Sequence, residues 1–298
     1  MAIKNFLNIE TKLLTEAQVV IVPFGFEATT TYGQGSKLGS KAIIEASGQV
    51  ELFDEELWQE TYKKIDITTI QEPKNLKDLG VVISKIIKNK RLPITLGGEH
   101  SITPFIIEAY KKSGFDNFSI LQFDAHADLR DGYLGKKYSH AAAMRRCLDF
   151  DGVSLVQVGI RNISNENDEL TFWKKNQNRP VNSAKAKHEV NIKTFWAKDK
   201  KKWKIDEMVR ALKKDVYISF DVDAFDCSLM PSTGTPEPGG LFWDQTVDIL
   251  KTVCRKKNII GVDFVELAPI KGLRAPDFLV AKLIYKTMGY IFKKQKDE

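Results

Sequence analysis

The feature that most constrains how this chain can fold is a buried strand that leads directly into three side chains able to bind metal. The run Phe118–Phe123 is apolar and rich in β-formers, and Asp124, His126 and Asp128 follow it. Side chains alternate between the two faces of a strand, so these three residues point the same way if the extended geometry continues past Phe123. Carboxylates at the end of a buried strand repel one another and resist burial unless a cation or hydrogen-bond donors compensate them. The segment therefore predicts a metal site, with a hydrogen-bonded structural cluster as the alternative.

Three other segments repeat this arrangement. Each follows a β-rich run and supplies acidic or histidine side chains: Glu99 and His100; Asp221 and Asp223; Asp263 and Glu266. The chain has only 4 His, of which His100 and His126 stand at such strand ends and His140 lies on the segment after one. In an open α/β sheet, ligands bind outside the carboxyl ends of the strands. The four strand ends therefore predict one metal pocket.

The ligand types indicate which metal this pocket holds. Mixed imidazole and carboxylate ligands suit Mn, Fe, Co, Ni or Zn, whereas carboxylates alone favour Mg or Ca. Acidic groups outnumber imidazoles and no Cys takes part, which favours Mn(II). Several of the aspartates could bridge two metal ions, and their number suggests that the pocket holds two ions rather than one.

Hydrophobic patterns along the chain predict about eight strands that alternate with helices. The expected strands are 18–24, 64–68, 93–96, 118–123, 154–160, 189–192, 216–221 and 259–265. The expected helices are 41–47, 76–89, 102–112, 140–149, 168–176, 205–214, 243–256 and 277–292. Alternation predicts a mostly parallel sheet covered on both faces, with an eight-stranded barrel as the competing architecture. No linker-like break or repeat interrupts residues 1–298, so we expect a single domain.

The composition limits the partners and the compartment. Of the 298 residues 43% are hydrophobic, enough for a substantial core. No apolar run reaches the length of a membrane span, and the N-terminus lacks a signal-peptide pattern. The 3 Cys match no zinc or disulfide framework, which favours reduced thiols. The lysine runs within 185–204 and 293–296 are typical of solvated faces, and no nucleic-acid motif accompanies them. We expect a cytoplasmic protein with no nucleic-acid or membrane partner.

Several segments resemble the signature of a known family. Gly97–Ser101, Phe123–Asp128 and Ser219–Asp226 closely resemble signature segments of the ureohydrolase (arginase/agmatinase) superfamily. Gly234–Gly240 is similar to the segment that follows the last metal aspartates in that family, and the resemblance extends from about Pro23 to Pro269. It implies a three-layer α/β/α sandwich on a mostly parallel eight-stranded sheet, the arginase-like fold, and favours it over the barrel.

The same resemblance implies a binuclear manganese site with two Mn²⁺ per subunit. Its ligand positions in this chain are His100, Asp124, His126, Asp128, Asp221 and Asp223. It implies that Asp124 and Asp221 bridge both ions and that His126 ligates the second ion. Asp128 and Asp223 would each complete one coordination shell. The family commonly forms trimers or hexamers, so a homo-oligomer is expected.

The resemblance also implies roles in hydrolysis of a guanidino group. Water bound between two divalent ions loses a proton near neutral pH and becomes the nucleophile, which Asp128 can aim. Glu266 matches the acid that holds the planar guanidinium cation by charge-assisted hydrogen bonds. His140 matches the position that shuttles a proton to the departing amine. From the residues alone, His140 could instead face solvent at a helix start, and Glu266 could form a surface salt bridge.

The loops around these segments favour agmatine, cleaved to putrescine and urea. Two features that are typical of the arginase branch are missing, one from the stretch Leu129 to Asp131 and one from the stretch Gly159 to Ile163. Met144–Arg146 resembles the agmatinase branch instead. Agmatine has an ammonium tail, which an acidic or aromatic wall would suit. The loops offer these side chains for that wall: Asp131, Glu166, Asp168 and Trp173.

Three departures from the agmatinase pattern keep other substrates open. They are Ala141, Cys227 and Ser232, where Gly, Pro and Gly are common. N1-aminopropylagmatine, a guanidino acid, arginine or formimidoylglutamate is therefore an alternative substrate. A non-catalytic metal-binding relative is the alternative from another functional class, although every ligand position and Glu266 carry workable chemistry.

Overall fold

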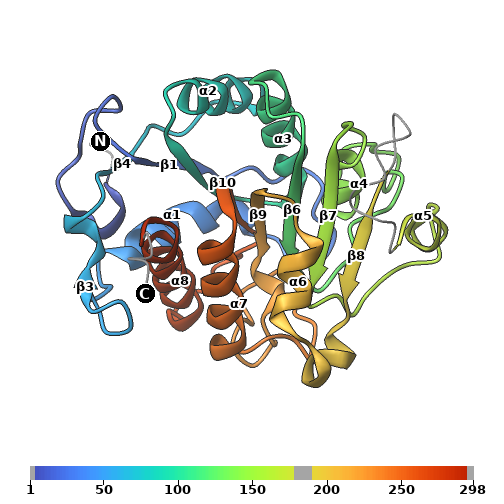
Figure 1. Ribbon diagram of the computed structural model, residues 1–298. Coiled ribbons are helices and arrows are strands. Elements are labelled where there is room, and N and C mark those ends of the chain that lie inside the picture. The colour runs from blue at the N-terminus through green and yellow to red at the C-terminus, as the bar shows by residue number, and fades with distance from the viewer. Residues whose placement is uncertain (1–3, 178–189, 294–298) are drawn as a thin grey trace.

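An eight-stranded parallel sheet forms the centre of the computed structural model, which describes residues 4–177 and 190–293 (Figure 1). The strand order is β4-β1-β5-β10-β9-β6-β7-β8. The strands are β1 Val19–Phe24, β4 Ile67–Thr69, β5 Leu92–Gly97, β6 Phe118–Phe123, β7 Val153–Val158, β8 Ile192–Phe195, β9 Asp215–Asp221 and β10 Asn258–Val265. A small hairpin, β2 Phe53–Asp54 with β3 Gln59–Glu60, lies outside this sheet.

Helices cover both faces of the sheet and make it the middle of three layers. The helices are α1 Gly39–Ser47, α2 Leu76–Lys88, α3 Thr103–Lys112, α4 Ala143–Cys147, α5 Glu169–Asn176, α6 Ile205–Ala211, α7 Trp243–Lys256 and α8 Ala275–Phe292. Figure 1 shows α2 and α3 on one side of the sheet and α1, α8, α7 and α6 on the other. The expected α/β sandwich on a mostly parallel sheet is confirmed, and the sheet is open rather than closed into a barrel.

Continuous apolar strands account for the two separate cores. Side chains alternate along β1, so Val19 and Ile21 join the core under α1, α7 and α8, whereas Val20 and Val22 join the core under α2 and α3. All six residues of β1, β5, β6 and β7 are buried, which is typical of parallel strands covered on both faces.

Most predicted elements are found within a few residues of their expected ends, and the exceptions have local causes. The strand expected over 64–68 begins only at Ile67, because the amides of Lys64 and Ile65 still bond to the Thr61 carbonyl of the preceding 3-10 turn. The helix expected over 205–214 ends at Ala211, and the amide of Lys213 donates to Ser119 Oγ on the neighbouring strand instead. The helix expected over 140–149 divides into a 3-10 turn and the short α4.

The expected strand 189–192 is shifted along the chain. Residue 189 lies outside the described residues, and β8 begins at Ile192, where the prediction ended it. Strand β8 lies at an edge of the sheet, where Lys193 and Thr194 are only half-buried. Polar residues are tolerated at such positions, so the strand has little apolar alternation. The apolar pattern was therefore too weak to define the ends of this strand.

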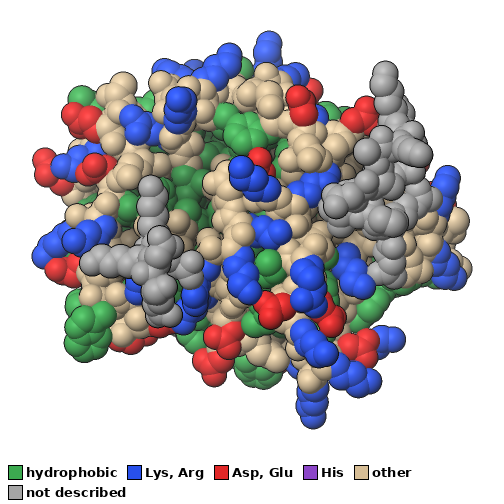
Figure 2. Space-filling model, in the orientation of Figure 1, with side chains coloured by type: hydrophobic (Ala, Val, Ile, Leu, Met, Phe, Trp, Pro, Cys, Tyr) green, Lys and Arg blue, Asp and Glu red, His purple; other side chains and the backbone are tan. Residues whose placement is uncertain are grey.

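The described part of the lysine-rich stretch forms a surface turn. Ala197–Lys202 is a 3-10 helix, and Lys200 Nζ donates to the carbonyls of Gly239 and Gly240 at 3.1 and 2.6 Å. Figure 2 shows Lys and Arg side chains spread over this face with acidic side chains among them. Within the described ranges no helix has both the length and the apolar character needed to cross a lipid bilayer.

The sheet order explains how distant segments reach one place. The strands β5, β6 and β9 lead into candidate ligands and β10 leads into Glu266. These four strands are consecutive neighbours in the sheet, in the order β5-β10-β9-β6. All strands of the sheet run parallel, so their carboxyl ends lie at one edge. Ligands more than 100 positions apart in the sequence, such as His100 and Asp221, therefore converge at that edge.

A buried lysine ties α8 to the β2–β3 hairpin. Lys286 Nζ lies 3.1 Å from Asp54 Oδ1 and 3.2 Å from Glu56 Oε2, and the Lys286 side chain is 4% exposed. Removing one partner of a buried ion pair leaves the other charge uncompensated.

We expect Lys286→Ala to lower the free energy of unfolding by about 3 kcal/mol, measured by urea denaturation. Lys256→Ala is the matched control, because its pair with Asp206 is exposed to solvent and should contribute little to stability. Equal losses in the two variants would contradict the role of burial at Lys286.

Candidate metal centre

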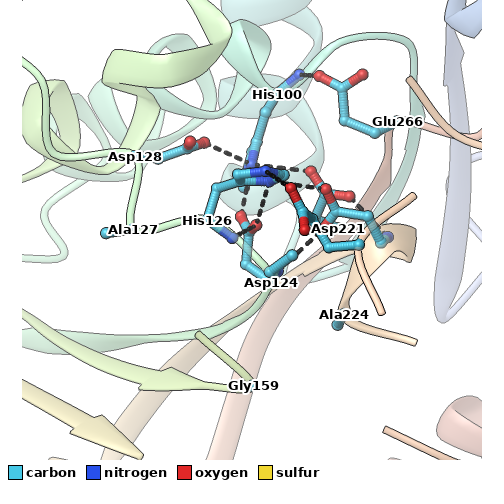
Figure 3. Close-up of polar contacts among 12 residues, drawn as sticks. His100, Asp124, His126, Ala127, Asp128, Gly159, Asp221, Ala224 and Glu266 are labelled. Carbon is cyan, nitrogen blue, oxygen red and sulfur yellow. Dashed lines mark hydrogen bonds and ion pairs between the residues drawn. The ribbon is translucent and has the colours of Figure 1, made fainter. Parts of the chain in front are cut away.

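A pocket of about 340 Å³ opens at the carboxyl ends of the central strands. The predicted site residues that line it are His100, His126, Asp128, His140, Asp221, Asp223 and Glu266. Asp124 lies beneath them and is fully buried. Residues 30–33, on the loop after β1, form part of the pocket wall. Figure 3 shows the His100, His126, Asp124 and Asp221 side chains turned toward one another.

One half of the cluster is centred on His100. Its Nδ1 lies 3.2 Å from Asp124 Oδ2, 3.0 Å from Asp128 Oδ2 and 3.4 Å from Asp221 Oδ2. Among the described residues Nδ1 has no hydrogen-bond partner, since none of these oxygens meets an N–H in hydrogen-bond geometry. One nitrogen and three carboxylate oxygens around a point is an arrangement suited to a cation.

The other half is centred on His126. Its Nδ1 lies 2.9 Å from Asp223 Oδ2 and 3.7 Å from Asp124 Oδ1. Asp124 therefore offers one carboxylate oxygen to each half, as expected of a ligand shared by two ions. Two sets of ligand atoms each lie within 4.8 Å of one another: His100, Asp124 and Asp128; Asp124, His126 and Asp223.

Hydrogen bonds behind His100 determine which of its nitrogens is free for a metal. Ser219 Oγ donates to Asp263 Oδ1 at 2.8 Å, so its single hydrogen is used. It must then accept the bond from His100 Nε2, which lies 2.9 Å away. In the neutral ring the proton is on Nε2, and the lone pair of Nδ1 faces three carboxylates. That buried arrangement is repulsive unless a cation lies between them, so the residues fit a metal.

The charges of the cluster lead to the same conclusion. Burial and the charge of Asp124 raise the pKa of Asp128 to about 7. Burial and the charges of Asp223 and Asp124 raise the pKa of Asp221 well above its ordinary value. Bound divalent cations would stabilise these carboxylates in the ionised form that ligates metal.

A row of buried polar residues supports Asp124 from the other side. Gln122 Nε2 donates to Asp124 Oδ2 at 2.7 Å, Gln157 Nε2 donates to Gln122 Oε1 at 2.7 Å, and Thr194 Oγ1 donates to Gln157 Oε1 at 2.8 Å. The three polar residues are register partners on β6, β7 and β8. The sequence prediction missed them, although a polar residue two positions before a ligand in an otherwise apolar strand is a signal for such support.

Glu266 lies inside the pocket and is only 9% exposed. Burial raises its pKa to about 8, and its Oε1 accepts a bond from the backbone N–H of His100 at 2.6 Å. The alternative of a surface salt bridge is therefore wrong. Glu266 follows β10 directly and has a φ of 66°, which turns the chain sharply at the strand end.

His140 also lines the pocket instead of facing away from it at a helix start. Its Nδ1 and its backbone nitrogen both lie 3.0 Å from Thr29 Oγ1. Burial lowers the pKa of its imidazole, an effect that the negative charge of Glu99 partly opposes.

The structure does not bring the expected acidic wall to the pocket. Asp131 lies outside the lining, and its carboxylate accepts from Arg146 Nη2 at 2.7 Å. Glu166, Asp168 and Trp173 are also outside the lining. The acidic side chains found in the lining beyond the cluster are Glu169 and Glu237, which the sequence prediction did not name.

One geometric premise of the sequence prediction is wrong. Strand β6 ends at Phe123, and Asp128 has a φ of 53°, so the segment 124–128 is not extended throughout. The ligands converge because the chain turns around the strand end, where the amides of Ala125 and His126 donate to the carboxylates of Asp223 and Asp124 at 2.9 and 2.6 Å.

Gly98, directly before Glu99, allows the loop after β1 to approach the site. A Cβ on Gly98 would lie 1.9 Å from the carbonyl oxygen of Phe26, which the Glu99 amide contacts at 2.8 Å. No other residue type fits at this point without moving the loop.

Comparisons with known proteins agree with this geometry. The model of the arginase family matches residues 17–289. The N(1)-aminopropylagmatine ureohydrolase of Synechocystis sp. is 33% identical over 98% of this chain and 95% of its own length. The agmatinase of Pyrococcus horikoshii is 29% identical, with 95% of each chain covered. The solved agmatine ureohydrolase of Thermoplasma volcanium is 27% identical, with a TM-score of 0.77 over 98% of this chain and 95% of that one.

We expect Asp124→Asn and Asp223→Asn each to lose at least one of two bound divalent ions, because an amide oxygen is a weaker ligand than a carboxylate. Metal analysis after dialysis measures the loss, and circular dichroism checks that the variants remain folded. Asp206→Asn, at an exposed position on α6, is the control. Two ions retained by both ligand variants would contradict the proposed ligand set.

Proposed function

The chain belongs to the arginase family, whose members are hydrolases acting on guanidino C–N bonds, and we propose that its substrate is a polyamine-type guanidine, with N1-aminopropylagmatine preferred to agmatine. The observation that carries the hydrolytic proposal is the His100 lone pair that faces three carboxylates above a pocket containing Glu266 and His140. The arginase family depends on a binuclear metal centre, and this chain has a matching His/Asp cluster.

The metal ligands in this proposal are the six residues named from the sequence: His100, Asp124, His126, Asp128, Asp221 and Asp223. Two divalent ions held there would supply a strongly acidified water near neutral pH. We assign manganese to the site, because its donors are imidazole and carboxylate without thiolate.

The chain's own groups then act on the substrate. The cationic guanidinium stabilises Glu266 in its ionised form, and Glu266 accepts hydrogen bonds from that planar group and holds its carbon beside the His/Asp cluster. Asp128 accepts a hydrogen bond from the attacking water and orients it. As the oxygen bonds to the guanidinium carbon, the C–N bond to the alkyl amine breaks, and His140 delivers a proton to that nitrogen. Urea and the free amine result.

The preference for a cationic tail rests on the pocket wall. Tyr32 and Glu237 line the pocket and suit an ammonium group. Arg130 also lines it, but its guanidinium packs over the Tyr133 ring at 4.5 Å and lies 3.8 Å from Glu169. Its charge is therefore compensated, which makes it a weak anchor for the carboxylate of arginine or of a guanidino acid.

Relatives of this chain carry both polyamine-type names. Two proteins of Thermus thermophilus strains named N(1)-aminopropylagmatine ureohydrolase are 35% and 36% identical over 92% of this chain. The agmatine prediction therefore becomes the second candidate. A homo-oligomeric state and a cytoplasmic location remain predictions from the sequence.

The substrate test is urea release by the manganese-loaded protein with N1-aminopropylagmatine, agmatine and arginine in parallel. We expect kcat/KM for N1-aminopropylagmatine to exceed that for agmatine by about tenfold, because a second ammonium gains contacts with the wall. Arginine should give almost no urea. Comparable urea release from arginine would contradict the substrate assignment. No urea release from any of the three compounds, with both metals bound, would favour a non-catalytic relative.

His140→Ala should slow turnover by about 10²–10⁴-fold while the metal content stays unchanged, because proton delivery to the leaving amine is lost. Steady-state kinetics across pH and metal analysis measure the two effects. A variant with the wild-type rate and pH profile would show that His140 does not shuttle the proton.

A further inference from the structure

We propose that Glu99 and Thr29 are positioning residues that fix the tautomer of His140, with the proton on Nδ1 and the lone pair of Nε2 available to the substrate pocket. The use of His140 in proton transfer rests on the proposed function. The hydrogen bonds that determine the tautomer do not depend on it.

Glu99 is a buried carboxylate that acts only as an acceptor. It is fully buried, and its Oε2 accepts from the backbone amides of Ala28 and Thr29 at 2.7 and 2.6 Å. Its Oε1 accepts from the hydroxyls of Thr29, at 2.8 Å, and of Ser101. Two of these four partners are backbone amides, which can only donate, and the Ser101 hydroxyl donates to the same oxygen as Thr29. The Thr29 hydroxyl must therefore donate to Glu99.

The bond to Glu99 uses the single hydrogen of the Thr29 hydroxyl. Its oxygen can then only accept, and two nitrogens of His140 lie within reach. The backbone N–H of His140 donates to it at 3.0 Å, and Nδ1 lies at the same distance. For that second contact to be a hydrogen bond, Nδ1 must carry the proton. In the neutral ring Nε2 then has the lone pair.

This tautomer suits a group that first accepts and then delivers a proton. Nε2 can take a proton from the pocket and pass it to the leaving amine, while Nδ1–H stays bound to Thr29 in both states. Among the charged groups near the ring, Glu99 favours the imidazolium and Arg130 opposes it. The Tyr133 ring packs edge-on against it with centroids 5.8 Å apart.

A simpler reading is that Glu99 only holds the loop after β1 in place. Its two bonds to the backbone amides of Ala28 and Thr29 would suffice for that. Lys136 Nζ, which donates to the Ala28 carbonyl at 2.7 Å, holds the same loop. The two interpretations differ in whether Oε1 of Glu99 must accept the Thr29 hydroxyl hydrogen. A substitution that changes only this oxygen therefore distinguishes them.

Glu99→Gln is that substitution. The two backbone amides are donors, so the Gln oxygen must face them, and its NH₂ group must face Thr29 Oγ1. Thr29 then accepts from the amide, and its hydroxyl hydrogen is free to turn to His140 Nδ1. The loop after β1 keeps its backbone hydrogen bonds to residue 99, but the ring proton of His140 should move from Nδ1 to Nε2.

Nitrogen NMR of ¹⁵N-histidine-labelled protein tests this directly, since it distinguishes protonated from unprotonated ring nitrogens. The protein is loaded with diamagnetic Zn²⁺ so that paramagnetic broadening does not hide the signals. The chain has only 4 His, and the signals missing in His140→Asn identify His140. We expect Nδ1–H in the wild type and in Thr29→Ser, and Nε2–H in Glu99→Gln. A proton on Nε2 of His140 in the wild type, or the same His140 tautomer in Glu99→Gln as in the wild type, would overturn the proposal.

Kinetics with the manganese-loaded protein supply the second readout. Thr29→Val removes the hydroxyl at nearly constant volume, whereas Thr29→Ser keeps it. We expect Thr29→Val and Glu99→Gln to lower kcat by about 10²-fold or more and to shift the pH profile, with KM and metal content little changed. Thr29→Ser should retain most of the activity. Wild-type kcat in Thr29→Val would overturn the positioning role.

The two readouts separate this inference from the proposed function. If no guanidino compound is hydrolysed but the NMR tautomers are as expected, the proposed function fails and the positioning of His140 stands. If urea is released but the tautomers are not as expected, only the positioning fails.

Discussion

The structure depends on one unfavourable interaction, the repulsion between several buried carboxylates and one imidazole lone pair that lie together at one edge of the sheet. His100 Nδ1 has three carboxylate oxygens within 3.4 Å. The hydroxyl of Ser219, already committed to Asp263, directs the imidazole proton to the opposite nitrogen. Amide donors from Ala125, His126 and Gln122 offset part of this negative charge. Burial opposes a charged imidazole, but the surrounding carboxylates raise the pKa of His100 well above its ordinary value. The cost of such burial is the reason for a cation here, and the surrounding fold keeps the carboxylates from moving apart.

That fold could be predicted from the sequence where the signals are local. The strands β5, β6 and β9 are largely apolar runs that lead into candidate ligands, and β10 leads into Glu266, so both the strands and these side chains could be predicted directly. The ends of β8 could not, because the apolar pattern of this edge strand is weak. The end of α6 could not, because the amide of Lys213 bonds to Ser119 on β6. Tertiary contacts of this kind have no trace in a local pattern.

The limits at the site have the same origin. His100, Glu266 and His140 were found because their side-chain types are chemically distinctive. The supports around them were missed, since Thr29 and Glu99 are 70 positions apart and Gln122 reads as an ordinary strand residue. The backbone turn at Asp128 was mistaken for an extended one. The ligands nevertheless converge as predicted, because parallel neighbouring strands bring their ends together whatever path the connecting loop takes.

The most direct test of the central claim is anomalous X-ray diffraction from crystals of the manganese-loaded protein. The account predicts two anomalous peaks, one bonded to His100 Nδ1 and the other to His126 Nδ1, with the Asp124 carboxylate between them. It also predicts that the His100 ring keeps its Nε2 contact with Ser219. A cluster without anomalous density, or a single ion bound away from both histidines, would contradict it.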